Sequence, residues 1–141
     1  METCLSFGEF PDFVRFQLPV LVWMGLIFVL SSLPGSTLSP LEFKDAHLIA
    51  HLLLFGMLYY LGYRALRFQN YSRLLREFSL LAALLFVMLY GATDEYHQSF
   101  TPGRRMELKD FLWDVLASVI VLLIVIVADK VKQNRGKLET R

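Results

Sequence analysis

Four long stretches without charge constrain this chain more than any other feature of its sequence. They cover residues 16–33, 48–63, 78–93 and 111–128, and only Asp114 interrupts the last of them. A helix needs roughly 20 apolar residues to cross about 30 Å of hydrocarbon. Each stretch approaches that length, so the sequence predicts an all-α, polytopic membrane protein with four transmembrane helices.

A soluble four-helix bundle is the alternative interpretation, and it requires a polar stripe along each helix. Residues 80–90 and 121–128 are apolar on every side of a helix and leave no room for such a stripe. The 141 residues are 55% hydrophobic and 19% charged, which is also too apolar for an ordinary soluble domain. The length admits one domain, so we expect a single unit over residues 1–141, with a core at 16–128 and a basic tail at 129–141.

Composition excludes several classes of function. The formal net charge is +1, which gives no indication of a nucleic-acid partner. Cys4 is the only cysteine, so an intramolecular disulfide and a cysteine-based zinc site are both excluded.

The distribution of basic residues predicts the orientation in the membrane. Four spans place both termini and the second loop on one side, and the first and third loops on the other. Ten of the fourteen Lys and Arg residues fall on the first side, and the other four are Lys44, Arg104, Arg105 and Lys109. The positive-inside rule then makes the termini cytoplasmic and turns the first and third loops outward. We expect a multi-pass protein of the inner (cytoplasmic) membrane, whose basic tail is attracted to anionic lipid head groups.

Two connecting segments carry local signals. The second loop, residues 64–77, is short enough to be only a turn. In the first loop, residues 39–42 form a capping box with proline at the first helical position, which predicts that the second helix begins well before His47.

Polar pairs stand at the outward end of three predicted helices. The members of each pair are four residues apart and share one helix face. The pairs are His47 with His51, Asp94 with Gln98, and Asp110 with Asp114, and Glu95 and His97 accompany the second pair. If Asp129 marks the inner boundary, Asp114 lies about 22 Å from it, below the outer head groups of a ~30 Å core. Ionisable groups at such depth cost about 2.5–3.5 kcal/mol each and normally face a bundle interior or a cavity.

A structural interpretation accounts for any one of these residues alone. His51 can be a neutral core histidine that bonds a carbonyl, and Asp110 can favour its helix N-terminus through the macrodipole. The convergence of three helices at one depth favours a site instead. Pro102 and Gly103 predict a turn that presents Arg104, either as a clamp for an anion or as a counter-charge for the acids.

The same residues carry a resemblance to a known family. The stretches FVLSSLPG, HLIAHLLLFGMLYYLGYRAL and DEYHQSFTPGRRMELKDFLWDVLAS are similar to those of VanZ-like membrane proteins, named for a teicoplanin-resistance protein. The resemblance covers residues 21–124. The chain departs from many relatives in having Ala117, Ser118 and Val119 where they have a glycine-rich stretch, which bears on helix packing there. The family's polar motif residues fall on Ser31, Ser32, His51, Asp94, Glu95, His97, Gln98, Pro102, Gly103, Arg104, Asp110 and Asp114.

The resemblance implies an integral membrane protein connected with glycopeptide resistance and the cell envelope, but no settled reaction. One hypothesis is an enzyme that hydrolyses or transfers a phosphate-bearing envelope lipid. Its catalytic residues are then drawn from His51, Asp94, Glu95, His97 and Asp114, and its substrate-binding residues from Arg104, Gln98, Asp110, Ser31 and Ser32.

Two alternatives stay open at this point. In the first, the same pocket binds or shields a lipid head group or a glycopeptide without bond-making. In the second, the polar cluster only locks the helices together. Carboxylates with imidazole suit Mn²⁺, Zn²⁺ or Mg²⁺, so a divalent metal is compatible with the residues, although their spacing gives only weak support for one. The expected partners are membrane lipids, with a lipid-linked envelope precursor or a glycopeptide as the ligand.

Overall fold

A computed structural model gives the structure of the protein and describes residues 12–38 and 46–139. Every regular element in these residues is a helix. In chain order they are η1 (Phe13–Gln17, a π-helical turn), α2 (Leu18–Ser31), α3 (Gly35–Leu38), α4 (Ala46–Phe68), α5 (Arg73–Glu77), α6 (Ser79–Gln98) and α7 (Leu108–Glu139).

Four helical spans are long and apolar enough to cross a membrane. They are Phe13–Ser31, Ala46–Phe68, Ser79–Gln98 and Leu108–Lys137. The predicted all-α fold with four candidate membrane spans is therefore confirmed.

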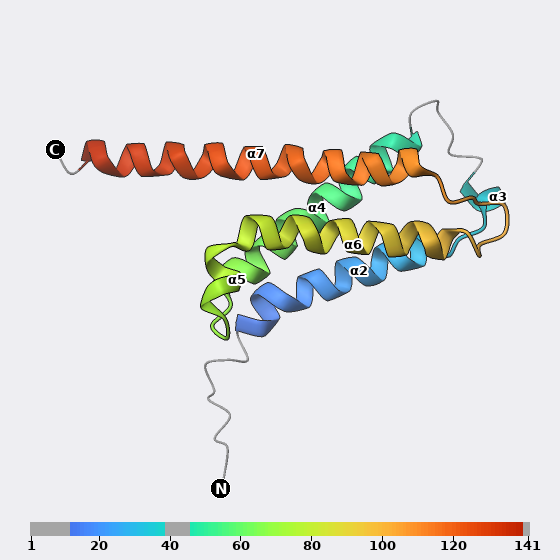
Figure 1. Cartoon of the computed structure of the whole chain (residues 1–141), viewed down its shortest axis with the longest axis horizontal. Coiled ribbons are helices and arrows are strands. Elements are labelled where there is room, and N and C mark those ends of the chain that lie inside the picture. The colour runs from blue at the N-terminus through green and yellow to red at the C-terminus, as the bar shows by residue number, and fades with distance from the viewer. Residues whose placement is uncertain (1–11, 39–45, 140–141) are drawn as a thin grey trace, which may run out of the picture.

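The spans run alternately up and down, which brings distant parts of the chain together at two ends (Figure 1). The start of α2, helix α5 and the carboxyl end of α7 lie at one end. Helix α3, the start of α4, the end of α6 and the start of α7 lie at the other, which we call the α3 end. All the predicted polar pairs therefore belong to the α3 end.

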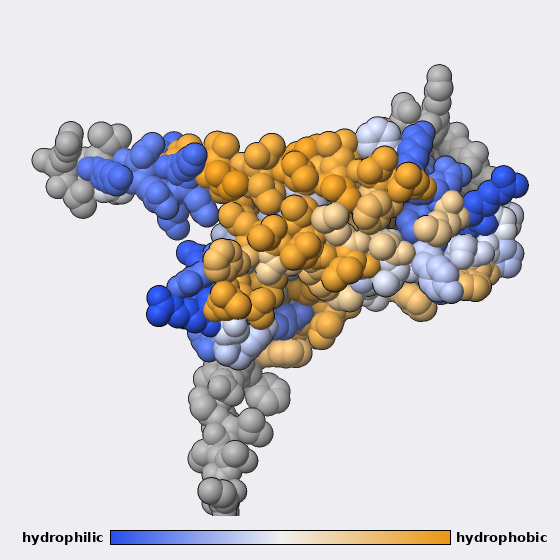
Figure 2. Space-filling view, viewed as in Figure 1, coloured by the Kyte–Doolittle hydropathy of each residue, from blue (hydrophilic) through white to orange (hydrophobic). Residues whose placement is uncertain are grey.

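The lateral surface of the bundle is apolar. Figure 2 shows a hydrophobic band across the middle of the face in view, with hydrophilic residues at both ends. Large side chains such as Leu53, Leu89 and Val127 are mostly exposed on this band. Contiguous apolar surface of this kind suits a lipid environment and would be unfavourable in water.

Helix α4 lies at the centre and packs against α2, α6 and α7. Its Phe55, Leu58 and Tyr59 are almost completely buried, together with Ile27 of α2 and Val87 of α6. The core is thus built around one helix, and α4 positions the site residues that it carries relative to all the others.

Three polar side chains bond backbone carbonyls of neighbouring helices inside the apolar region. The Trp23 indole donates to Leu54 at 2.9 Å, the Tyr90 hydroxyl to Met24 at 2.7 Å, and the Tyr59 hydroxyl to Leu80 at 3.1 Å. Such bonds hold helices together in lipid, where water is not available as a competing partner.

Small residues lie on both sides of the contact between α4 and α7. A Cβ atom built on Gly56 would lie 3.4 Å from the Val121 side chain and 3.9 Å from that of Ala117. Ala117 is buried, and the Ser118 hydroxyl donates to the carbonyl of Asp114 at 2.8 Å. Ala117 is therefore accommodated at this contact, where a Cβ at Gly56 would make only ordinary van der Waals contacts.

The prediction for the second loop is wrong in part. Helix α4 continues to Phe68, and α5 forms a further helical turn in which Ser72 accepts a hydrogen bond from the backbone of Leu75. Arg64 and Arg67 do not stop α4, because long basic side chains tolerate positions at the edge of a membrane. The predicted capping box at residues 39–42 lies outside the described residues.

Candidate functional site

Two loops meet at the α3 end and carry part of the site. Helix α2 ends at Ser31, three residues before Pro34, and the backbone N–H of Gly35 then donates to the carbonyl of Pro102 at 3.1 Å. A Cβ atom at Gly35 would lie 2.5 Å from the carbonyl oxygen of Gly103, so only glycine permits this approach. The loop after α6 is therefore held directly against the end of α2.

The predicted turn at Pro102 and Gly103 is present. The backbone N–H of Arg104 donates to the carbonyl of Thr101 at 3.1 Å, and Gly103 has a φ of 76°. Proline followed by glycine with positive φ is the type II pattern, which a residue with a side chain would strain. The turn fixes the backbone from which the Arg104 side chain extends.

Arg104 begins a chain of hydrogen bonds that reaches α2 through α6. Its guanidinium donates to Oε1 of Gln98 at 3.0 Å, and the Gln98 amide donates to Oδ2 of Asp94 at 3.0 Å. The Ser31 hydroxyl donates to the same oxygen of Asp94 at 2.9 Å. The carboxylate of Asp94 is thus buried but hydrogen-bonded by two donors.

The guanidinium of Arg104 also donates to the carbonyl of Leu30 at 3.3 Å. Both of its acceptors in the described part of the chain are neutral oxygens, and no carboxylate there lies within salt-bridge distance. A guanidinium has five N–H donors, so this arrangement orients Arg104 without neutralising it.

His51 and Asp114 form a buried pair between α4 and α7. Nδ1 of His51 lies 2.7 Å from Oδ1 of Asp114, and their exposed fractions are 6% and 1%. The His51 ring also stacks in parallel on Phe55, with centroids 5.9 Å apart. A carboxylate on one ring nitrogen and an aromatic face beside the ring fix the orientation of this imidazole.

Glu95 lies next to this pair and is 1% exposed. Its Oε2 accepts the backbone N–H of Glu107 at 3.0 Å, whereas its Oε1 and the Oδ2 of Asp114 are buried without a hydrogen-bond partner among the described residues. His51, Glu95 and Asp114 each offer an atom that can ligate a metal, and these three atoms lie within 4.8 Å of one another.

A recess of about 130 Å³ opens in front of His51, between α2, α4 and α6. Five predicted site residues line it, and Ile27, Leu30, Leu54 and Phe55 supply apolar walls. The five are Ser31, His51, Asp94, Gln98 and Arg104. One small cavity is therefore lined by the guanidinium of Arg104, the buried carboxylate of Asp94 and the oriented imidazole of His51.

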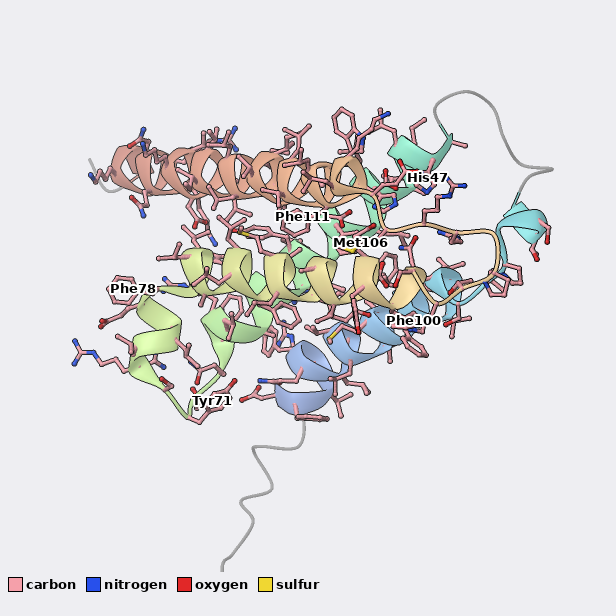
Figure 3. The ribbon with its side chains drawn as sticks, turned by 45° about the vertical axis from the view of Figure 1, so that its right-hand side comes forward. His47, Tyr71, Phe78, Phe100, Met106 and Phe111 are labelled. Carbon is pink, nitrogen blue, oxygen red and sulfur yellow. The ribbon has the colours of Figure 1, made fainter. Side chains whose placement is uncertain are left out.

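His47 also lines the recess, although the sequence did not single it out as a site residue beyond its pairing with His51. Figure 3 shows it where α4 begins, close to the start of α7. Its Nδ1 lies 3.5 Å from Oδ1 of Asp110, and more than half of its side chain is exposed. The predicted residue Asp110 thus contacts a histidine at the rim of the recess.

Two predicted site residues lie apart from the recess. The Ser32 hydroxyl donates to the carbonyl of Phe28 at 2.7 Å and lies 3.0 Å from Nε2 of His97. The His97 ring stacks on Phe28 with centroids 4.6 Å apart. This pair connects α2 to α6 on a more exposed side.

Sequence reasoning missed three supports of the site. The buried Thr101 hydroxyl donates to the carbonyl of Ser31, and the backbone of Glu107 bonds Glu95. Gly91 also leaves room for the acids, because a Cβ there would lie 3.2 Å from Oδ2 of Asp114. No signal in a single sequence identifies these contacts, because a backbone donor has no residue preference and the other two join different segments of the chain.

The fold and this site define a class: a small, all-helical, multi-pass membrane protein with a polar recess at one end of its bundle. A family model described as VanZ/LLP1 matches residues 16–129, and the chain belongs to this family. Comparison with curated proteins and with solved structures finds no match.

Proposed function

We propose that this VanZ-family protein binds the phosphate-bearing head group of an envelope lipid in its recess and hydrolyses or transfers it at phosphorus. The observation that carries the proposal is the state of Arg104. Its guanidinium lines the recess and is oriented by the oxygens of Gln98 and Leu30. No carboxylate of the described residues forms a salt bridge with it, so its positive charge is available to a ligand. A planar guanidinium binds phosphate through two parallel hydrogen bonds.

Reaction at phosphorus needs a positive clamp and a group that handles a proton or the attacking oxygen. Arg104 supplies the clamp. The imidazole of His51 lines the same recess and is oriented by Asp114 at 2.7 Å, so this pair is placed to supply the second requirement.

The size of the recess favours a small charged group as the ligand. A volume of about 130 Å³ is below the 300–1,000 Å³ typical of pockets for drug-sized molecules. A phosphoryl group fits such a space, whereas a glycopeptide does not. We therefore propose that any link to teicoplanin resistance acts through an envelope lipid or lipid-linked precursor, not through capture of the antibiotic in the recess.

We propose further that the protein lies in the cytoplasmic membrane with the α3 end facing outward. The support is the excess of Lys and Arg residues at the opposite end of the bundle. In a Cys4→Ser background, an impermeant maleimide should label Arg105→Cys in intact cells and Lys132→Cys only after lysis. The reverse pattern would place the recess beside the cytosol and contradict this orientation.

The test of function uses the full chain in lipid nanodiscs that contain polyprenyl phosphate, polyprenyl diphosphate or phosphatidic acid, with phosphatidylcholine alone as the blank. Binding and release of phosphate are measured for the wild type, Arg104→Lys and Arg104→Ala. We expect Arg104→Ala to lose at least about tenfold in affinity for the phosphate lipid, and Arg104→Lys to recover only part of it, because the ammonium lacks the planar fork.

Arg105→Ala is the matched control, because Arg105 is exposed, adjacent and of the same charge. Equal losses in the two alanine variants would show that general surface charge attracts the lipid and would reject the proposed clamp. Turnover by substoichiometric protein identifies an enzyme, whereas saturable binding without product would identify a protein that only binds or shields the head group.

A further inference from the structure

We propose that His51, Glu95 and Asp114 bind one divalent cation beside the recess, which His51 lines. This inference deepens the proposed function, because it specifies how the His51–Asp114 pair acts there. The cation site itself rests only on these three side chains. It can therefore be tested without knowing the lipid.

The ligand set comes from three different helices. His51 extends from α4, Glu95 from α6 and Asp114 from α7, and their ligating atoms lie within 4.8 Å of one another. Ligands of one Zn²⁺ ion at about 2.0–2.2 Å are separated by less than this, so a small movement of side chains brings the three atoms onto a common ion.

Two buried oxygens point to a ligand independently of the cluster. Oε1 of Glu95 and Oδ2 of Asp114 have no hydrogen-bond partner among the described residues, and each residue is 1% exposed. A buried acceptor without a partner costs about 1–3 kcal/mol, and more if it is charged. A cation that binds both oxygens removes this cost.

The second oxygen of each carboxylate is already held by the protein. Oε2 of Glu95 accepts the backbone N–H of Glu107, and Oδ1 of Asp114 pairs with His51. A protein group that orients a ligating carboxylate, as the Glu107 N–H does for Glu95, is typical of the shell around a metal. The contact of His51 with Asp114 joins two of the proposed ligands, so it gives way when both bind the ion. Gly91 adds space beside Oδ2 of Asp114, where a Cβ would approach to 3.2 Å.

The charge balance at the α3 end also favours a cation. Four carboxylates are buried there, those of Asp94, Glu95, Asp110 and Asp114. The basic groups that line the recess are Arg104, His51 and His47. Arg104 bonds only neutral oxygens, so in the described residues no guanidinium pairs with these carboxylates, and burial of unpaired negative charge is unfavourable. A divalent cation supplies positive charge directly beside two of the carboxylates.

The chemistry of the donors indicates the kind of ion. One imidazole nitrogen with two carboxylate oxygens suits Zn²⁺ or Mn²⁺, whereas Mg²⁺ prefers oxygen ligands alone. Three protein ligands leave coordination positions open for water or a phosphate oxygen. Since His51 also lines the recess, an ion bound by it lies beside the space that holds the proposed phosphoryl group.

The experiment measures metal content and needs no substrate. Full-length protein in nanodiscs is stripped with EDTA and equilibrated with Zn²⁺, Mn²⁺ or Mg²⁺, and the bound metal is measured by mass spectrometry after gel filtration. We expect one Zn²⁺ or Mn²⁺ ion per chain and much weaker retention of Mg²⁺. Glu95→Gln and Asp114→Asn should each weaken the Zn²⁺ affinity by at least about tenfold.

Glu107→Gln provides the matched control, because its carboxylate is exposed while its backbone N–H is the one that holds Glu95. Glu95→Gln preserves shape, so it remains a valid test even if Asp114→Asn does not fold. Saturating Zn²⁺, at about 100 times its Kd, should also raise the melting temperature of the wild type by roughly 5–10 °C and that of Glu95→Gln by much less.

Failure to retain Zn²⁺ or Mn²⁺ in the wild type overturns the proposal, as does equal retention by the wild type and Glu95→Gln. Neither result affects the lipid affinity that depends on Arg104. Conversely, a metal site that persists while Arg104→Ala binds phosphate lipid normally would reject the proposed clamp and leave the cation site standing.

Discussion

Replacement of Glu95 by glutamine should stabilise the metal-free protein. Glu95 is 1% exposed, and only its Oε2 has a partner, the backbone N–H of Glu107. Glutamine keeps a carbonyl oxygen for that bond. Its NH₂ group takes the place of the unpartnered Oε1, and one carboxylate oxygen of Glu95 lies within 4.8 Å of one of Asp114, whose Oδ2 also has no partner in the described residues. The change therefore removes one buried charge and gives two unpartnered positions a possible partner.

The magnitude follows from the groups involved. Relief of a buried unsatisfied acceptor is worth about 1–3 kcal/mol. For a chain of this length, 1 kcal/mol shifts the melting temperature by roughly 2–4 °C. We expect Glu95→Gln to melt about 2–12 °C above the wild type when both have been stripped of metal.

Thermal unfolding in detergent can be followed by the fluorescence of Trp23 and Trp113 in the presence of EDTA. Glu107→Gln is the control and should change little, because its side chain is exposed. If metal-free Glu95→Gln melts at the same temperature as the wild type or below it, then Glu95 is satisfied in the folded protein, and the reasoning from its unpartnered oxygen is refuted.

Two further predictions concern the contacts that position the site. Gly35→Ala places a Cβ 2.5 Å from the carbonyl oxygen of Gly103 and must displace the turn that carries Arg104. Binding of phosphate lipid should therefore fall by at least about tenfold. The control variant Gly25→Ala, which has open space around it, should bind the lipid normally. Trp23→Phe removes the bond to the Leu54 carbonyl and should lower the free energy of unfolding by about 0.6–1.7 kcal/mol in a denaturant titration, and an unchanged stability would show that this bond does not help to hold α2 on α4.

The sequence was sufficient to predict the four helical spans, because charge-free length is a local property of a chain. Their ends were predicted less well. The second stretch was expected to end at Tyr63, but α4 continues to Phe68 through Arg64 and Arg67. Helix α7 likewise extends well past residue 128. Polar residues end a membrane core but not a helix, so hydropathy underestimates helix length.

The sequence predicted which residues belong to the site better than which of them contact one another across helices. Spacing along each helix suggested that His47 belongs with His51 and that Asp110 belongs with Asp114. The structure keeps His47 beside His51, with ring centroids 4.7 Å apart, and in addition pairs His51 with Asp114 and His47 with Asp110 across helices. Which residues face one another depends on the rotation and depth of two helices, and a single sequence carries little information on either.

The adjacent acids Asp94 and Glu95 on α6 can be used to test whether the polar cluster is a structural network or a functional site. Asp94 accepts hydrogen bonds from Ser31 and Gln98 at 2.9 and 3.0 Å, so its shell is satisfied and helps to hold α2 to α6. Glu95 retains an oxygen without a partner in the described residues. We therefore expect the two variants to change the free energy of unfolding of the metal-free protein in opposite directions. Asp94→Asn should lower it by about 1–3 kcal/mol, because a neutral amide accepts weaker hydrogen bonds from Ser31 and Gln98 than a carboxylate does. Glu95→Gln should raise it. Loss of an unpartnered buried charge at a functional site often stabilises a protein at the expense of its function. Destabilisation by both variants would therefore indicate that the acids only lock the helices together.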